Sequence, residues 1–253
     1  MSEAAAPPDI ETVTVDRVAG TWHIHQLRRG HRYSTDDQLC AVVGAQSQPD
    51  ARRVLDMGAG IGSVGLMALH LLHEEATVTM IEAQELSHDL ARRTVALNEL
   101  QHRVTLRLGD LRDPAMLPET EHGSYDLVLG SPPYFPLGTG GVSPHPQRAA
   151  CRMELRGDVF DYCRTAALAL APHSLFSLVH SGVDPRPEAA LAEAGLTIRS
   201  RLDVYFRRDR PAPTIAVWIA GKGGTRVDPE PLVIRESDGP HSEAYKAILA
   251  LMS

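Results

Sequence analysis

Three glycines in alternation follow an apolar run that ends in Asp56, and they are the clearest chemical signal in the sequence. Residues 54–69 read VLDMGAGIGSVGLMAL, with Gly58, Gly60 and Gly62 between the apolar run and a helix-favouring run. This order predicts a strand, a tight turn and a helix. Glycines let the main chain approach a ligand closely, and a helix N-terminus supplies unpaired N–H donors and the positive end of a dipole. The turn therefore predicts a ligand-binding loop.

The spacing of the glycines distinguishes between ligands. A dinucleotide-binding turn follows G-x-G-x-x-G and would need glycine at position 63. That position is Ser63, and the third glycine comes one residue earlier, at Gly62. The pattern disfavours an NAD-dependent dehydrogenase. D-x-G-x-G-x-G resembles the first motif of S-adenosylmethionine-dependent methyltransferases, where the acid and the turn hold the amino-acid end of the cofactor. The alternative is an ordinary strand–helix turn that uses glycine for its shape.

A second chemical signal is the run Ser131-Pro132-Pro133-Tyr134, which follows the apolar segment YDLVLG. The apolar segment predicts a buried strand, which would deliver this run to the same sheet edge as the glycine turn. The two prolines restrict the loop and remove its N–H donors, which leaves carbonyl groups pointing outward. The run resembles the fourth motif of amino methyltransferases, [N/D/S]-P-P-[Y/F]. The alternative is a proline turn with buried aromatic rings.

Such a motif suits methylation of an exocyclic amine on a base, which is a poor nucleophile because its lone pair is delocalised into the ring. Two acceptors, the Ser131 side chain and a proline carbonyl, can bind the two amine hydrogens. The lone pair of the nitrogen then faces the sulfonium methyl group. The aromatic ring stacks on the base, which must leave any helical stack to enter. We therefore expect Ser131, Pro132, Pro133 and Tyr134 to be the catalytic residues.

The surrounding elements predict a mostly parallel sheet. Residues 77–82 and 104–108 are further strands separated by a helix over 86–100, which extends a strand–helix–strand alternation. Two β-rich runs, 197–206 and 214–220, predict an antiparallel pair that closes the sheet. We expect an α/β fold of the Rossmann-like class I methyltransferase type, with seven strands and an antiparallel C-terminal hairpin.

Two acids follow the ends of the second and third predicted strands. Glu82 lies twenty residues beyond Gly62, and an acid at this strand tip accepts hydrogen bonds from ribose hydroxyls. Asp110 would lie at the same sheet edge, within reach of an adenine amine. Capping of a helix or a loop is the alternative for both. The expected cofactor-binding residues are Thr35, Asp56, Gly58, Gly60, Gly62, Glu82 and Asp110.

Arginines gather in two stretches that the topology could bring to the site. Residues 28–37 read RRGHRYSTDD, and residues 136–152 are rich in glycine and proline without periodicity. A loop as long as the second stretch beside a site is usually functional. The alternative for the first stretch is a capped helix over the sheet edge, with Ser34 or Thr35 as N-cap. The expected substrate-binding residues are Phe135, Arg148, Arg152 and Arg32.

Composition sets further bounds. The chain has 253 residues, three scattered cysteines and a net charge of −7. The scattered cysteines predict a cytoplasmic protein without disulfides or structural zinc. The acidic, proline-bearing N-terminus predicts no secretory signal, and the absence of a long apolar run predicts no membrane span. The net charge argues against a broad non-specific nucleic-acid grip but leaves room for a local arginine patch. We expect a disordered tail over 1–13 and one domain over 14–253. In that domain, 14–50 form a hairpin and helix, and 221–253 form a C-terminal extension.

Over nearly the whole chain after about residue 14, the order of motifs resembles that of bacterial tRNA adenine-N6 methyltransferases. The motifs are RRGHRYSTDD, DMGAGIG, GSPPYF, CRMEL and PLVIRESDG…SEAY. The resemblance implies S-adenosylmethionine as cofactor, tRNA as RNA partner and adenine N6 as target. No metal is needed, because the sulfonium is already activated. Ser131 departs from this family, which usually has asparagine there. S-P-P-Y is more familiar from cytosine-N4 methyltransferases, which leaves the target base open.

Two other functions are compatible with the same motifs. An amide nitrogen needs the same two acceptors, so a protein amide or a small molecule is an alternative methyl acceptor. The other alternative is a protein that binds the cofactor but has lost catalysis, because serine replaces asparagine at position 131. The oligomeric state is open.

Overall fold

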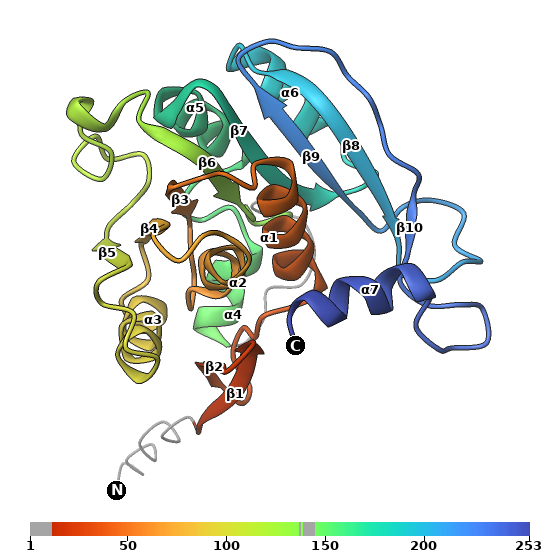
Figure 1. Ribbon diagram of the computed structural model, residues 1–253, viewed down its shortest axis with the longest axis horizontal. Helices are drawn as coiled ribbons and strands as arrows, with labels where there is room; N and C mark the ends of the chain where they lie inside the picture. The colour runs from red at the N-terminus through yellow and green to blue at the C-terminus, as the bar shows by residue number, and fades with distance from the viewer. Residues whose placement is uncertain (1–11, 137, 139–144) are drawn as a thin grey trace, which may run out of the picture.

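The computed structural model describes residues 12–136, 138 and 145–253 (Figure 1). Most of the tail expected over 1–13 lies outside the described residues. The described chain begins with an antiparallel hairpin of β1 (Val13–Ala19) and β2 (Trp22–Leu27). The hairpin is bound to α3 (Glu85–Leu97), because the His25 N–H donates to Thr94 Oγ1 at 2.9 Å.

The central sheet has eight strands in the order β10-β8-β9-β7-β6-β3-β4-β5. Neighbours are parallel except for β7–β9 and β8–β9. The expected class I fold is therefore confirmed, but the expectation of seven strands was one too few. The extra strand has only two residues, too short to show a side-chain alternation in the sequence. The strands are β3 (Arg53–Met57), β4 (Thr77–Glu82), β5 (Val104–Leu108), β6 (Tyr125–Gly130), β7 (Leu170–Ser181), β8 (Thr197–Tyr205), β9 (Ile215–Gly221) and β10 (Leu232–Val233).

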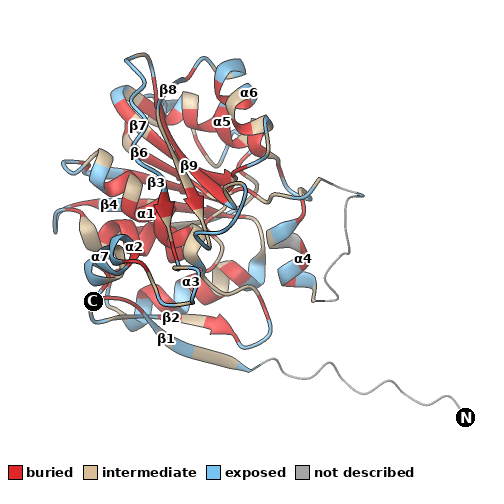
Figure 2. Cartoon of the chain, turned by 90° about the vertical axis from the view of Figure 1, so that its right-hand side faces the viewer, coloured by how far each residue is buried: buried red, intermediate tan, exposed pale blue. Residues whose placement is uncertain are grey.

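Helices cover both faces of the sheet, and neighbouring residues of the inner strands point to opposite faces. Val54 packs in the cluster that contains α1, α2 and α3, whereas Leu55 packs in the cluster that contains α5 and α6. Burial of both sides explains why the strands are continuously apolar, and Figure 2 shows the sheet buried between its helices. The remaining helices are α1 (Thr35–Ser47), α2 (Ser63–Leu71), α4 (Pro146–Arg152), α5 (Val159–Ala169), α6 (Arg186–Glu193) and α7 (Glu243–Leu251), with a 3₁₀ turn at Glu119–Glu121.

The stretch expected to be a loop over 136–152 contains a helix, α4, at its end. Pro146 occupies the first turn, where a missing N–H costs no hydrogen bond, and the His145 side chain accepts from the Arg148 N–H. A helix of seven residues is too short for its periodicity to be recognised among glycines and prolines. Within the described residues, no helix combines the length and apolarity needed to cross a membrane.

Phe176 on β7 tests the core between the sheet and α5. Its side chain is fully buried, so Phe176→Ala should lower the free energy of unfolding by about 3–5 kcal/mol in urea denaturation. The control Leu168→Ala removes a side chain that is 51% exposed and should change stability by less than about 0.5 kcal/mol. Equal losses in the two variants would contradict this description of the core.

Candidate active site

A cavity of about 550 Å³ lies at the carboxyl ends of β3, β4 and β6. The register of the sheet creates it, because Met57 at the end of β3 pairs with Ile81 on β4 and with Gly130 on β6. The chain therefore leaves β3 and β6 at the same level. Gly60 and Pro133 both line the cavity, as the parallel topology predicts.

The glycine turn follows β3 directly and forms one wall. Gly58, Gly60 and Gly62 have φ values of +61°, +58° and +89°, which side chains rarely tolerate. A Cβ on Gly58 would lie 1.9 Å from the Tyr162 hydroxyl, whereas nothing lies within 4 Å of a Cβ placed on Gly60. The turn thus leaves open space beside Gly60, where a ligand can approach the main chain. Gly58 and Gly60 line the cavity, and Gly62 is the N-cap of α2 behind it.

Asp56 is placed behind the turn and not on the cavity wall. Its carboxylate is buried and accepts from the Gly65 N–H at 2.8 Å, which ties β3 to the start of α2. Burial raises its pKa to about 8 despite this hydrogen bond. The residue therefore shapes the turn from inside the protein.

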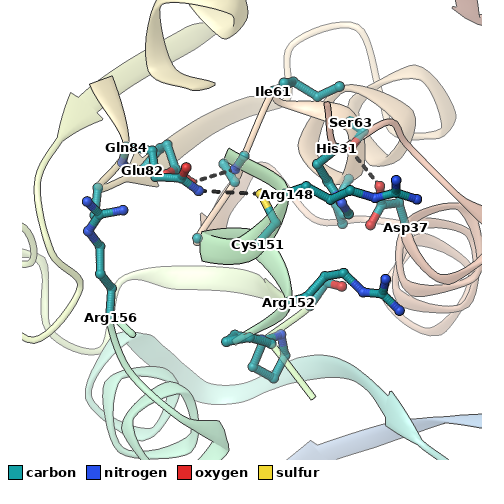
Figure 3. Close-up of a pocket in the computed structure, with 18 of the residues that line it drawn as sticks. His31, Asp37, Ile61, Ser63, Glu82, Gln84, Arg148, Cys151, Arg152 and Arg156 are labelled. Carbon is teal, nitrogen blue, oxygen red and sulfur yellow. Dashed lines mark hydrogen bonds between the residues drawn. The ribbon is translucent and has the colours of Figure 1, made fainter. Parts of the chain in front are cut away.

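Glu82 lines the cavity and fixes the glycine turn from the neighbouring strand. One carboxylate oxygen accepts from the Gly60 N–H at 2.8 Å, and the other accepts from the Gln84 N–H at 2.6 Å. Burial raises its pKa. Figure 3 shows Glu82 and Gln84 together on one side of the cavity.

Two expected cofactor-binding residues lie beside the cavity without lining it. Gly109 and Leu111 belong to its wall, but the Asp110 side chain forms an ion pair with Arg112 at 2.6 Å. Thr35 lies between two wall residues, and its Oγ1 is 3.5 Å from the Tyr245 hydroxyl of α7.

The run from Ser131 to Phe135 lines the same cavity as the glycine turn. The Tyr134 hydroxyl donates to Asp36 Oδ2 at 2.7 Å, and its ring centroid lies 4.6 Å from that of His180. Phe135 is 41% exposed, with the Arg152 guanidinium 5.5 Å from its ring centroid. Tyr134 is thus held firmly in the wall, while Phe135 is open to an approaching molecule.

Asp37 is a wall residue that was not among the expected site residues. It is almost fully buried and accepts from Ser63 Oγ at 2.9 Å (Figure 3) and from the Ser34 N–H at 3.4 Å. Burial raises its pKa to about 7. Two adjacent acids at a helix start indicate capping, and nothing in their order distinguishes the one that faces a cavity.

Cys151 also lines the cavity. Gln84 Nε2 donates to its sulfur at 3.4 Å. Burial raises the pKa of its thiol to about 12, so the thiol stays protonated and is a poor nucleophile.

Six arginines and three carboxylates line the cavity. Arg32 forms an ion pair with Asp16 at 3.0 Å. Within the part of the chain that the structure describes, the other five form no ion pair. Figure 3 shows Arg148 and Arg152 extending together from α4 toward the side where Asp37 lies, with Arg156 on the opposite side. The five are Arg28, Arg29, Arg148, Arg152 and Arg156.

Gln147 ties the two arginine-bearing segments together. Its Oε1 accepts from the His31 N–H at 2.9 Å, and its Nε2 donates to Ser87 Oγ at 3.1 Å. This side chain is buried and fixes α4 beside the loop that precedes α1. Among the described residues, no cluster of histidine, cysteine and acidic side chains is arranged to hold a metal ion.

The fold, a family match and the relatives described here together indicate a class I S-adenosylmethionine-dependent methyltransferase. Residues 39–139 match the family model described as Methyltransferase small domain. The cavity volume is within the usual range for small-molecule sites, and the open space at Gly60 fits a cofactor that contacts main chain. Both observations agree with S-adenosylmethionine as the cofactor.

The chain is similar to a Tolumonas auensis protein named tRNA1(Val) (adenine(37)-N6)-methyltransferase. The two are 28% identical over 90% of this chain and 92% of the relative. A predicted O-methyltransferase from Agrobacterium tumefaciens has a similar solved structure, with a TM-score of 0.63 and 20% identity over 87% of this chain and 97% of that chain. The structure of Pyrococcus horikoshii TYW2 in complex with MeSAdo is also similar. Its TM-score is 0.56, with 18% identity over 84% of this chain and 73% of that chain. These structures show the fold alone.

The buried Asp56 carboxyl predicts a pH dependence of stability. Its pKa is about 8 in the folded chain and about 3.9 when unfolded. Between these two pH values the folded chain keeps a proton on Asp56 that the unfolded chain has released. The contribution of Asp56 to stability is therefore complete below about pH 4 and is lost as the pH rises to about 8. Asp56→Asn keeps an acceptor for the Gly65 N–H without titrating.

Urea unfolding between about pH 5 and pH 8 measures the effect. The free energy of unfolding of the wild type should fall with pH more steeply than that of Asp56→Asn, by up to about 1.4 kcal/mol per pH unit. The exposed control Asp50→Asn should keep the slope of the wild type. Parallel profiles for wild type and Asp56→Asn would show that Asp56 is ionised in the folded chain.

Proposed function

We propose that this protein transfers the methyl group of S-adenosylmethionine to N6 of an adenine in tRNA, in the cytoplasm. The observation that carries the proposal is that the glycine turn and the Ser131–Phe135 run face one cavity. One wall suits a cofactor that binds main chain, and the other offers acceptors for an amine. The names of the relatives make adenine 37 of a valine tRNA the first substrate to test.

S-adenosylmethionine supplies an activated methyl group when it is bound. In the proposed mechanism, the main chain at Gly58 and Gly60 binds it, with Glu82 holding the turn in shape. The Ser131 hydroxyl and a carbonyl of the proline pair accept the two hydrogens of the amine, which directs the nitrogen lone pair toward the methyl group.

The arginines favour a nucleic acid over a protein amide or a small molecule as substrate. A chain with a net charge of −7 nevertheless places six arginines around one cavity. Arginine binds phosphate in a two-pronged geometry and stacks on bases. We propose that Arg148 and Arg152 bind phosphates beside the target nucleotide, and that Phe135 stacks on a base.

The reaction itself is tested by incubating the protein with methyl-labelled cofactor and total tRNA, followed by mass spectrometry of the nucleosides. We expect label in N6-methyladenosine, and a loss of about tenfold or more in rate for Ser131→Ala because one amine acceptor is removed. Label in N4-methylcytidine would change the target base, and no label in any nucleoside would overturn the proposal. Cofactor binding without turnover, with turnover restored in Ser131→Asn, would indicate a catalytically impaired protein.

The arginine contacts predict a salt-dependent affinity for tRNA. Replacing Arg148 and Arg152 by glutamine should weaken binding and reduce the slope of log affinity against log salt by about one for each lost phosphate contact. The matched control replaces Arg207 and Arg210, two exposed arginines between β8 and β9 that do not line the cavity. Filter binding at several salt concentrations measures both. The same loss in both double variants would show that tRNA is held by diffuse charge and not at this cavity.

A further inference from the structure

Tyr134 is held at three points by three different elements. Its hydroxyl donates to Asp36 of α1 at 2.7 Å, and its ring packs against His180 at the end of β7. Its main-chain carbonyl accepts from Arg186 Nη2 of α6 at 3.2 Å. The third contact comes from outside the cavity, because Arg186 is not part of its wall.

The hydrogen bond to the Tyr134 carbonyl matters because the two residues before Tyr134 offer no main-chain N–H donor. Pro132 and Pro133 have no N–H, so neighbouring elements cannot fix them through main-chain donors. Prolines also restrict the rotation of the chain between Ser131 and Tyr134. A fixed Tyr134 carbonyl therefore fixes the direction in which the Ser131 side chain and the proline carbonyls point.

Arg186 is itself held in one orientation by two carboxylates. Its guanidinium donates to Asp184 Oδ2 at 2.6 Å and to Glu154 Oε1 at 2.6 Å, while one Nη2 proton reaches the Tyr134 carbonyl. Glu154 also binds the loop directly, because its main-chain N–H donates to the Phe135 carbonyl at 3.0 Å. Only a planar group with several donors makes all these contacts at once.

His180 completes the support beneath the Tyr134 ring. Its side chain is fully buried, and the main chain of Pro133 and of Ser181 lies close to its ring. The charged groups that face it are Asp184, with Oδ2 at 3.7 Å from Nδ1, and Arg186. Burial lowers its pKa to about 4, so the ring is uncharged at neutral pH and serves as a packing surface.

We propose that Arg186 is a positioning residue for methyl transfer, which acts by fixing the Tyr134 carbonyl and thereby the acceptors that hold the target amine. The inference rests on the proposed function. It assigns a role in the reaction to a residue of α6 that touches neither cofactor nor base. A displacement of about 1 Å in a reacting group is enough to cost about a hundredfold in rate.

Kinetics of Arg186→Gln and Arg186→Lys test the proposal. We expect kcat to fall about tenfold or more in both, because lysine keeps the charge but not the planar fork. The dissociation constant of S-adenosylhomocysteine, measured by calorimetry, should stay within about twofold. The matched control is Arg164→Gln on α5. Arg164 also pairs with two acids, Asp161 and Glu193, but among the described residues it forms no hydrogen bond to the loop, and it does not line the cavity. Its kcat should match that of the wild type.

Hydrogen–deuterium exchange supplies a readout that does not depend on activity. Exchange at the amides of Ser131, Tyr134 and Phe135 should be faster in Arg186→Gln than in wild type and unchanged in Arg164→Gln. Unchanged exchange in this segment, or a full kcat in Arg186→Gln, would overturn the proposal. Faster exchange throughout the protein with an equal loss of cofactor affinity would overturn it too, by showing a purely structural role. If the wild type methylates no tRNA, the proposed function fails, while the exchange comparison still decides whether Arg186 fixes the loop.

Discussion

The pairing of β3 with β4 on one side and β6 on the other is the constraint on which the site depends. Met57 is level with Ile81 and with Gly130, so the glycine turn and the proline run start from neighbouring points of one sheet edge. A methyl donor and an amine can then be held in a single cavity. A register shift of one residue in either pair would turn the inner side chains to the wrong faces of the sheet.

Carboxyl groups hold the glycine turn in its shape. Asp56 lies behind the turn and Glu82 beside it, and both accept main-chain N–H groups. Asp37 accepts from Ser63 at the start of α2. Burial raises the pKa of each of them, which means that their ionised forms are costly to keep inside the protein. A buried carboxyl group that keeps its proton avoids this cost and still offers an oxygen to the main-chain N–H group.

The sequence was sufficient for the features that have strong local signals. Alternating glycines and the proline pair predicted the two loops, and the strand–helix alternation predicted their meeting at one edge. Features set by contacts between distant segments were missed. Helix α4 is too short for periodicity, Asp37 resembles a capping residue, and Arg186 acquires its role only because α6 packs behind the loop that carries Tyr134. The sequence also predicted Asp56 and Asp110 as cofactor-binding residues. Neither lines the cavity, because Asp56 accepts from the Gly65 N–H and Asp110 pairs with Arg112.

The most direct measurement is a crystal structure with a bisubstrate compound. In this compound a nitrogen atom replaces the sulfonium sulfur of the cofactor, and N6 of an adenosine is tethered to that nitrogen. We expect both halves to occupy the one cavity. The cofactor half should lie along Gly58 and Gly60, with its ribose toward Glu82, and the tethered N6 should lie between Ser131 and Tyr134. A complex in which either half is bound outside the cavity, or in which the tethered nitrogen points away from Ser131, would contradict it.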